Sequence, residues 1–454
     1  MGTLNVIRPQ GNAVKLSSKA LCLSTLSILI SVLPVWAEEL PAWLEKEVKT
    51  HHLTRQEALL IHKQSGLNGQ VREGAATVAS AVVEAGSPLG KRLLAEARQC
   101  VRELIPNPEG IAATTLKATV AKCVSKVAIF DSQGRKRPEA EQEERVIALL
   151  RALGEGLPTR EGRGEAIASL SHPQEDGQES KVFTVPVRVG AETKTFLLDT
   201  GAAHSVINNT LARKMKLSGV PLPAETFKQS VVGNQCTGKE QVSIVKLPEL
   251  TVGLASVRKL TGTAIPANLV PGGFAGAIGL DFLSAYDMVI DPKLAQLQLL
   301  SNTSTGHSID TIALHGISGL MVAQVRINGK GPFALALDTG ADEMVISQKL
   351  MQRLGIKPKA KRTIVGWCGQ DQSFVVQLND VTMGNHTLKN LKGIAIRGGL
   401  FENVKIDGLV GQNFLNQFRQ HWHFESPNEL GLVRNGSIEL EAIELETPSS
   451  QSTP

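Results

Sequence analysis

The spacing of apolar positions divides the chain into a helical part and a β-rich part. Between residues 38 and 168, apolar side chains recur every three or four positions in segments such as KRLLAEARQCVREL and EQEERVIALLRAL, which predicts amphipathic helices. After residue 180 the apolar segments are short, β-branched and partly alternating, and turn residues separate them. We therefore predict a helical domain over 38–168, a polar linker over 169–180 and a β region from 181 to 443. The polar tail over 444–454 is expected to be disordered.

The first 37 residues have the pattern of a secretory signal peptide. Arg8, Lys15 and Lys19 precede an apolar run over 20–36, and Val-Trp-Ala at 35–37 fits a small-x-small cleavage site. An uncleaved membrane anchor is the alternative, but a run of about 17 residues with a proline near its end is short for a bilayer span. We expect a periplasmic or secreted protein with no stable membrane span after cleavage.

Composition and charge narrow the possible functions. The 454-residue chain is 42% hydrophobic and 20% charged, with a formal net charge of +5. Removal of the signal peptide subtracts three positive charges and leaves about +2 (5 − 3). This balance argues against nucleic-acid binding, which needs a concentrated basic face.

Four of the five cysteines lie beyond the signal peptide, at Cys100, Cys123, Cys236 and Cys368. None has the paired CxxC spacing of a zinc site, so we do not expect a structural metal. An even number of cysteines in an exported protein permits two disulfides. Cys100 and Cys123 fall on neighbouring predicted helices, where a bridge would staple a helical hairpin; two buried free thiols are the alternative.

The β region contains an internal duplication. FLLDTGAAHSVI over 196–207 corresponds to FALALDTGADEMVI over 333–346. Two later pairs follow in the same order: SVVGNQCTG (230–238) with TIVGWCGQ (363–370), and GAIGLDFL (276–283) with DGLVGQNFL (407–415). A period this long does not suit a solenoid. It predicts two lobes, over 181–303 and 304–443, that are related by a pseudo-two-fold axis.

Symmetry of this kind would bring Asp199 and Asp338 together. A carboxylate at the end of an apolar strand is costly to bury alone. Two that lie close together share a proton, because both cannot easily ionise, and the pair then holds an acid and a base. Hydrolysis of an amide by an activated water requires both.

The duplicated Asp-Thr-Gly-Ala word and the later apolar-apolar-Gly elements resemble the aspartic proteases of the retropepsin type. The resemblance covers each half and implies a mainly β, bilobal acid-protease-like fold, preceded here by the helical domain. It implies Asp199 and Asp338 as catalytic residues, a peptide or protein substrate, and no metal or organic cofactor. The residues that would support the catalytic loops are Thr200, Gly201, Gly279, Thr339, Gly340 and Gly411.

The chain departs from the retroviral pattern at one pairing. Retroviral enzymes have Asp-Thr-Gly-Ala-Asp with an Arg after the second glycine element. Here Asp342 is present, but Gln412 stands where the Arg would be, and the first half has Ala203 and Leu280. Asp342 either meets substrate backbone near the cleft or is a solvated loop acid.

By the same resemblance, residues 230–246 and 363–378 are flap hairpins that close over substrate. The cysteines near their tips suggest a Cys236–Cys368 disulfide that ties the flaps; two unpaired thiols are the alternative. The residues expected to bind substrate are Ala202, Gly233, Cys236, Ala341, Asp342, Trp367 and Cys368.

These observations predict a monomeric aspartic endopeptidase with an intramolecular dyad. The main alternative is a non-catalytic protein that binds a peptide or a cell-envelope polymer on a protease fold. A weaker alternative is a dyad formed between two copies of the chain. The helical domain is interpreted as a stable accessory domain, with a removable pro-segment as the alternative.

Overall fold

The computed structural model describes residues 87–107, 111–152, 160–175, 178–222, 227, 231–236, 241–301, 310–397 and 399–443. The predicted signal peptide over 1–37, the first part of the predicted helical domain and the tail over 444–454 lie outside the described residues. Within the described part of the chain, no helix is long and apolar enough to cross a membrane.

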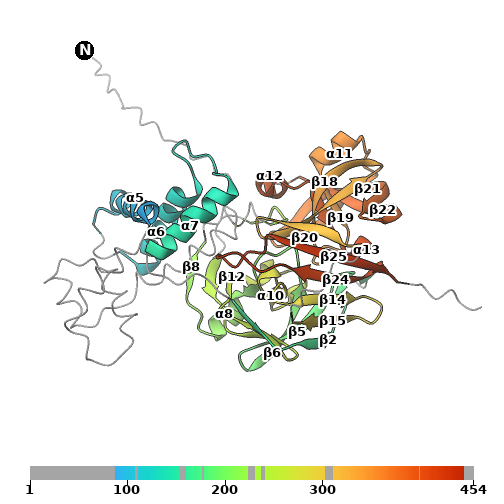
Figure 1. Cartoon of the computed structure of the whole chain (residues 1–454), viewed down its shortest axis with the longest axis horizontal. Helices are drawn as coiled ribbons and strands as arrows, with labels where there is room; N and C mark the ends of the chain where they lie inside the picture. The colour runs from blue at the N-terminus through green and yellow to red at the C-terminus, as the bar shows by residue number, and fades with distance from the viewer. Residues whose placement is uncertain are drawn as a thin grey trace, which may run out of the picture.

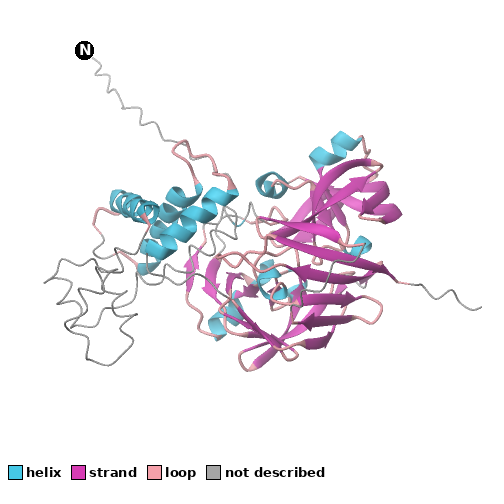
Figure 2. Cartoon of the chain, in the orientation of Figure 1, coloured by secondary structure: helices cyan, strands magenta, loops and turns pink. Residues whose placement is uncertain are grey.

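The structure is mainly β, as predicted, with a group of helices at one end (Figure 2). The three N-terminal helices are α5 (Pro88–Leu104), α6 (Ala113–Ile129) and α7 (Glu139–Ala152). The shorter helices within the β body are α8 (Asn209–Lys214), η2 (Ala267–Leu269), η3 (Pro271–Gly273), α10 (Leu280–Leu283), α11 (Gln348–Leu354), α12 (Gly399–Val404) and α13 (Gln412–Leu415).

One sheet belongs to the first lobe. Among the described residues it has ten strands, in the order β1 (Glu161–Arg163), β11 (Ala255–Arg258), β10 (Leu250–Val252), β5 (Thr184–Val189), β6 (Glu192–Leu198), β13 (Gly276–Ile278), β7 (Val206–Asn208), β12 (Thr261–Ile265), β9 (Ser243–Lys246) and β8 (Gly219–Pro221). Strand β5 shows the expected period of two, because Val185, Val187 and Val189 are buried while Pro186 and Arg188 are exposed.

The second sheet crosses from one lobe to the other. Its thirteen described strands follow the order β2 (Ala166–Ser169), β15 (Gln296–Leu300), β14 (Asp287–Asp291), β24 (Phe418–Phe424), β25 (Asn435–Ala442), β16 (Ile312–Ile317), β17 (Leu320–Ile327), β18 (Lys330–Leu337), β23 (Gly408–Val410), β19 (Met344–Ser347), β22 (His386–Ile396), β21 (Gly369–Met383) and β20 (Ala360–Gly366). Strands β14 and β24 are equivalent in the duplication and pair antiparallel, with Val289 opposite His421. The pseudo-two-fold axis therefore passes through this pair of strands.

Four short strands precede residue 181, where the sequence suggested that the β region begins. Helix α7 ends at Ala152, whereas β1 pairs with β11 and β2 pairs with β15. The expectation of helix up to residue 168 is therefore wrong after α7, and the 169–180 linker includes the small hairpin of β3 (Gln174–Glu175) and β4 (Gln178–Glu179). These strands have two to four residues, too few to show a period in the sequence.

The three N-terminal helices form a small layer of their own. Ser87 caps α5 by accepting the Gly90 N–H at 3.1 Å, and Pro88 occupies the first turn. A disulfide joins α5 to α6 through Cys100 and Cys123, whose Cα atoms are 5.7 Å apart.

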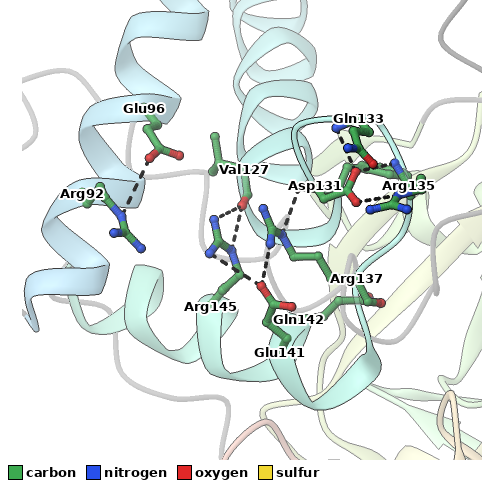
Figure 3. Close-up of polar contacts among 11 residues, drawn as sticks. Arg92, Glu96, Val127, Asp131, Gln133, Arg135, Arg137, Glu141, Gln142 and Arg145 are labelled. Carbon is green, nitrogen blue, oxygen red and sulfur yellow. Dashed lines mark hydrogen bonds and ion pairs between the residues drawn. The ribbon is translucent and has the colours of Figure 1, made fainter.

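A buried arginine links α7 to α6. The Arg145 guanidinium donates two hydrogen bonds to the Val127 carbonyl, at 3.0 and 2.9 Å (Figure 3). Beside it, Arg137 bonds Glu141 at 2.5 Å. The last turn of α6 thus receives the donors that its orphan carbonyls need.

The helices dock on both lobes. In Figure 1 they lie beside β8 and β12, and α6 contacts β8. Glu139 of α7 accepts hydrogen bonds from Arg434 at 2.9 Å and from the Ser318 N–H at 3.1 Å, and Glu143 also pairs with Arg434. A continuous apolar cluster joins side chains of the helices to lobe 1 and to the loop before β25, and it includes Leu93, Val120, Val124, Leu149, Val220, Ile244, Ile265, Leu430 and Leu432.

Candidate active site

Each aspartate of the duplicated word follows the last residue of a strand. Asp199 follows β6 and donates its N–H to the Ile278 carbonyl of β13 at 3.1 Å. Asp338 follows β18 and donates its N–H to Val410 of β23 at 3.0 Å. In both lobes the strand before the aspartate pairs in parallel with the strand before the second glycine element. The backbone therefore fixes both aspartates in the same way.

The two carboxyl groups meet at the lobe boundary. A Cβ atom placed on Gly201 would lie 2.4 Å from the Asp338 Cγ, and one on Gly340 would lie 2.7 Å from the Asp199 Cγ. Each carboxyl group thus packs on the glycine of the opposite loop, where no side chain fits. The two carboxyl groups are close enough for each to influence the pKa of the other.

Two buried threonines lock the loops together. The Thr200 hydroxyl donates to the Leu337 carbonyl at 2.8 Å and accepts the Thr339 N–H at 3.1 Å. Symmetrically, the Thr339 hydroxyl donates to Leu198 at 2.8 Å and accepts the Thr200 N–H at 2.9 Å. These four bonds all cross the lobe boundary. They fix the distance between the two aspartates.

Burial raises the pKa of both carboxyl groups. Burial, followed by the charge of Asp338, raises the pKa of Asp199 well above 3.8. Burial raises the pKa of Asp338 to about 6, against the opposing effect of the N–H that Gly340 donates at 2.8 Å. The pair therefore keeps one shared proton at a pH where an ordinary carboxyl group has lost its own.

The second glycine elements pack directly behind the catalytic loops. A Cβ atom on Gly279 would lie 2.7 Å from the Ala202 carbonyl oxygen, and one on Gly411 would lie 2.2 Å from the Glu343 oxygen. Only glycine fits at these two positions, as the duplicated sequence suggested.

A polar residue two positions after each of these glycines holds the loop. Asp281 accepts the Ser205 hydroxyl at 2.6 Å and the Ser205 N–H at 2.8 Å. Its counterpart Asn413 accepts the Met344 N–H at 2.9 Å. Neither residue was predicted from the sequence, although both stand at the same place of the repeat as polar residues in an apolar segment.

Comparison with known proteins agrees with this geometry in both lobes. Residues 185–282 match the family described as "Aspartyl protease", and residues 323–417 match the family described as "gag-polyprotein putative aspartyl protease". Both lobes belong to the retropepsin-like aspartyl proteases. No curated protein sequence matches the chain. Among solved structures, a retropepsin-like aspartic protease from Rickettsia conorii is 21% identical, with a TM-score of 0.22, over 30% of this chain and 93% of that one.

In these two retropepsin-like lobes, the position that carries Arg in the retroviral enzymes has a different residue. Gln412 is buried and donates to the Thr339 carbonyl at 3.2 Å. Asp342 accepts the Ser180 hydroxyl and the Lys181 N–H, both at 2.6 Å. Asp342 therefore ties lobe 2 to the segment that leads into lobe 1. A freely solvated loop acid is not what the structure shows.

A cavity of about 870 Å³ contains the dyad and lies between the retropepsin-like lobes. Its lining is largely apolar and includes Val182, Ala202, Phe274, Leu320, Ala341, Ile364 and Trp367. Its charged lining residues, apart from the dyad, are Lys136, Lys181, Asp342, Glu343 and Arg362. A partly apolar groove with a few charges suits an extended peptide. Ala202, Ala341, Asp342 and Trp367, all predicted to bind substrate, face this space.

The two flaps of the retropepsin-like lobes differ in form. The second is the expected hairpin, in which β20 and β21 pair down to Gly366 opposite Gly369. Residues 231–236 of the first flap form a loop, and no strand occurs among them. Its backbone pairs with the other lobe, since Gln235 donates to the Cys368 carbonyl at 2.8 Å. The first flap therefore differs from the second at its described tip, whereas its returning strand β9 pairs antiparallel with β8.

A disulfide joins Cys236 to Cys368, with their Cα atoms 5.2 Å apart. Both cysteines are buried, and a Cβ on Gly233 would lie 2.5 Å from the Cys368 carbonyl carbon. The structure places these three residues at the contact between the flap tips. Their predicted role in touching substrate is replaced by this structural one.

Proposed function

We propose that this chain is an aspartic endopeptidase that hydrolyses peptide bonds with a water activated between Asp199 and Asp338. The observation that carries the proposal is the packing of each carboxyl group on the glycine of the opposite catalytic loop. Two carboxyl groups in this arrangement share one proton, because they cannot both ionise easily when they are in contact. Structural aspartates gain nothing from such a pairing.

We assign a role to each aspartate. Asp338 accepts the Gly340 N–H, which favours its charged form, and acts as the base that takes a proton from the water. Asp199 holds the shared proton and donates a hydrogen bond to the carbonyl oxygen of the substrate, which gains negative charge as the water attacks. The proton that Asp338 has taken then passes to the leaving nitrogen, and the amide bond breaks.

The setting follows from the remaining features. Each lobe of one chain supplies one aspartate, so a monomer is sufficient. Two disulfides suit a protein of the periplasm or the extracellular space. The docked helices support an accessory domain, since they share an apolar cluster with the lobes.

Cleavage of a mixed peptide library, read by mass spectrometry, tests the proposal. The wild-type protein should generate new termini, and Asp199→Asn and Asp338→Asn should generate none. Asp380→Asn is the matched control, because Asp380 does not line the cavity and an asparagine oxygen can still accept the Gly329 N–H. Full activity in either dyad variant would remove the hypothesis.

A binding protein on the same fold is the second candidate, and the tied flap tips favour it. A cleft that cannot open can bind a peptide without hydrolysing it. The same library separates the two functions: a binding protein retains peptides on the wild-type chain and releases them intact.

A further inference from the structure

The tips of the two flaps are joined by more than the disulfide. The Cys368 N–H donates to the Val232 carbonyl at 2.9 Å, and the Gln235 N–H donates to the Cys368 carbonyl at 2.8 Å. The Asn234 side chain adds a bond to Asp371 at 2.9 Å. The loop of lobe 1 is thus attached to the hairpin of lobe 2 along its backbone.

This junction is also buried. Cys236 is 3% exposed and Cys368 is 0% exposed. Both belong to the apolar cluster that includes Leu93 and Val124 of the N-terminal helices. Separation of the tips would break a covalent bond and backbone hydrogen bonds, and it would open an apolar contact to water.

The joined tips and the catalytic loops face the same space. The cavity is lined by Asp199 and Asp338 on one side and by Val232, Gly366 and Trp367 from the segments at the tips. The catalytic loops are themselves joined by the threonine bonds. The two lobes, joined at the catalytic loops and at the flap tips, therefore form a closed ring around the substrate position.

We propose that substrate enters this ring lengthwise, as a single extended strand led by a free chain end. The proposal rests on the endopeptidase function above and specifies its substrate class. An unfolded tail or a linear peptide can pass as one strand. A loop held at both ends by folded structure would need the tips to part, or two strands side by side beneath them.

Two fusion substrates test this, both built on a sequence found by the library experiment. One carries a folded domain at one end and a free end at the other, and the second carries folded domains at both ends through equally long linkers. We expect the doubly capped form to be cleaved at least about tenfold more slowly, because the covalent bridge prevents the flaps from opening.

Removal of the bridge should abolish the discrimination. The Cys236→Ser/Cys368→Ser protein should cleave both forms at similar rates, whereas the matched Cys100→Ser/Cys123→Ser protein should still discriminate. Equal cleavage of both forms by the wild-type protein would overturn the proposal and leave the endopeptidase function standing. Equal discrimination by the bridge-free protein would also overturn it. No cleavage of either form would refute the function itself.

If the bridge-free protein does not fold, a third substrate decides. A peptide without caps and the singly capped form should be cleaved equally fast, since one free end is enough for entry. A singly capped form cleaved as slowly as the doubly capped one would show that bulk alone limits the rate, and the entry model would be wrong.

Discussion

Replacement of Asp338 by asparagine should stabilise the folded protein at neutral pH while it abolishes hydrolysis. Burial raises the pKa of Asp338 from 3.8 to about 6. Between these two values the folded state holds a proton that the unfolded state has lost. Stability therefore falls as pH rises from 3.8 to about 6, and the loss persists above that range.

The magnitude follows from the difference between the two pKa values. A raise from 3.8 to about 6 corresponds to about 3 kcal/mol. Asp338 is partly exposed to the cavity, so water screens part of this cost, and we expect a gain of about 2 kcal/mol for Asp338→Asn. For ~300 residues of β structure with ~2.1 cal/mol/K each, this gain raises the Tm by about 3 °C.

Thermal unfolding of both proteins at pH 7 and pH 4 is the assay. The Tm difference should be present at pH 7 and should shrink at pH 4, where the folded carboxyl group is protonated and the unfolded one is only about half ionised. Asp342→Asn should leave the Tm near wild type at both pH values. A dyad variant that is less stable than wild type at pH 7 would refute the reasoning, because it would mean that the carboxylate contributes favourably to the fold.

Three further results are expected. Thr339→Val should lower the free energy of unfolding by about 2–4 kcal/mol in denaturant titrations, because it leaves a buried N–H and a buried carbonyl unpaired, and Thr339→Ser should retain most of the stability. The kcat/KM should rise with pH as the dyad loses its first proton near 6 and fall at higher pH as it loses the shared proton; a profile flat between pH 5 and 7 would contradict a raised dyad pKa. Arg145→Met should destabilise the helical domain by about 1.5–3 kcal/mol, as followed by far-UV circular dichroism, since it removes two charged hydrogen bonds; an unchanged unfolding midpoint would show that the bonds are replaced by water.

The part of the site that the sequence predicted well is the part that each half encodes locally. The Asp-Thr-Gly word and the later glycine element lie on strands that are adjacent in each lobe, and the duplication itself implies the symmetry that joins them. The close packing at Gly201 and Gly340 follows from that symmetry.

The features that the sequence did not reveal depend on contacts between distant segments. Residues 231–236 find their hydrogen-bond partners in the hairpin of the other lobe, so their own pattern gives no sign of the fold. Asp342 likewise bonds Ser180 and Lys181, more than 160 positions away. Strands β1 and β2 are defined by the edges on which they pair, not by any periodicity of their own.

The order of strands in the shared sheet has a consequence for how the protein matures. Strands β24 and β25, from the end of the described chain, stand between β14 of lobe 1 and β16 of lobe 2. The sheet that runs through both lobes cannot be completed until this C-terminal pair has been synthesised and inserted. A nascent or prematurely terminated polypeptide that stops before Phe418 should therefore be inert, so proteolytic capacity would arise only in finished molecules.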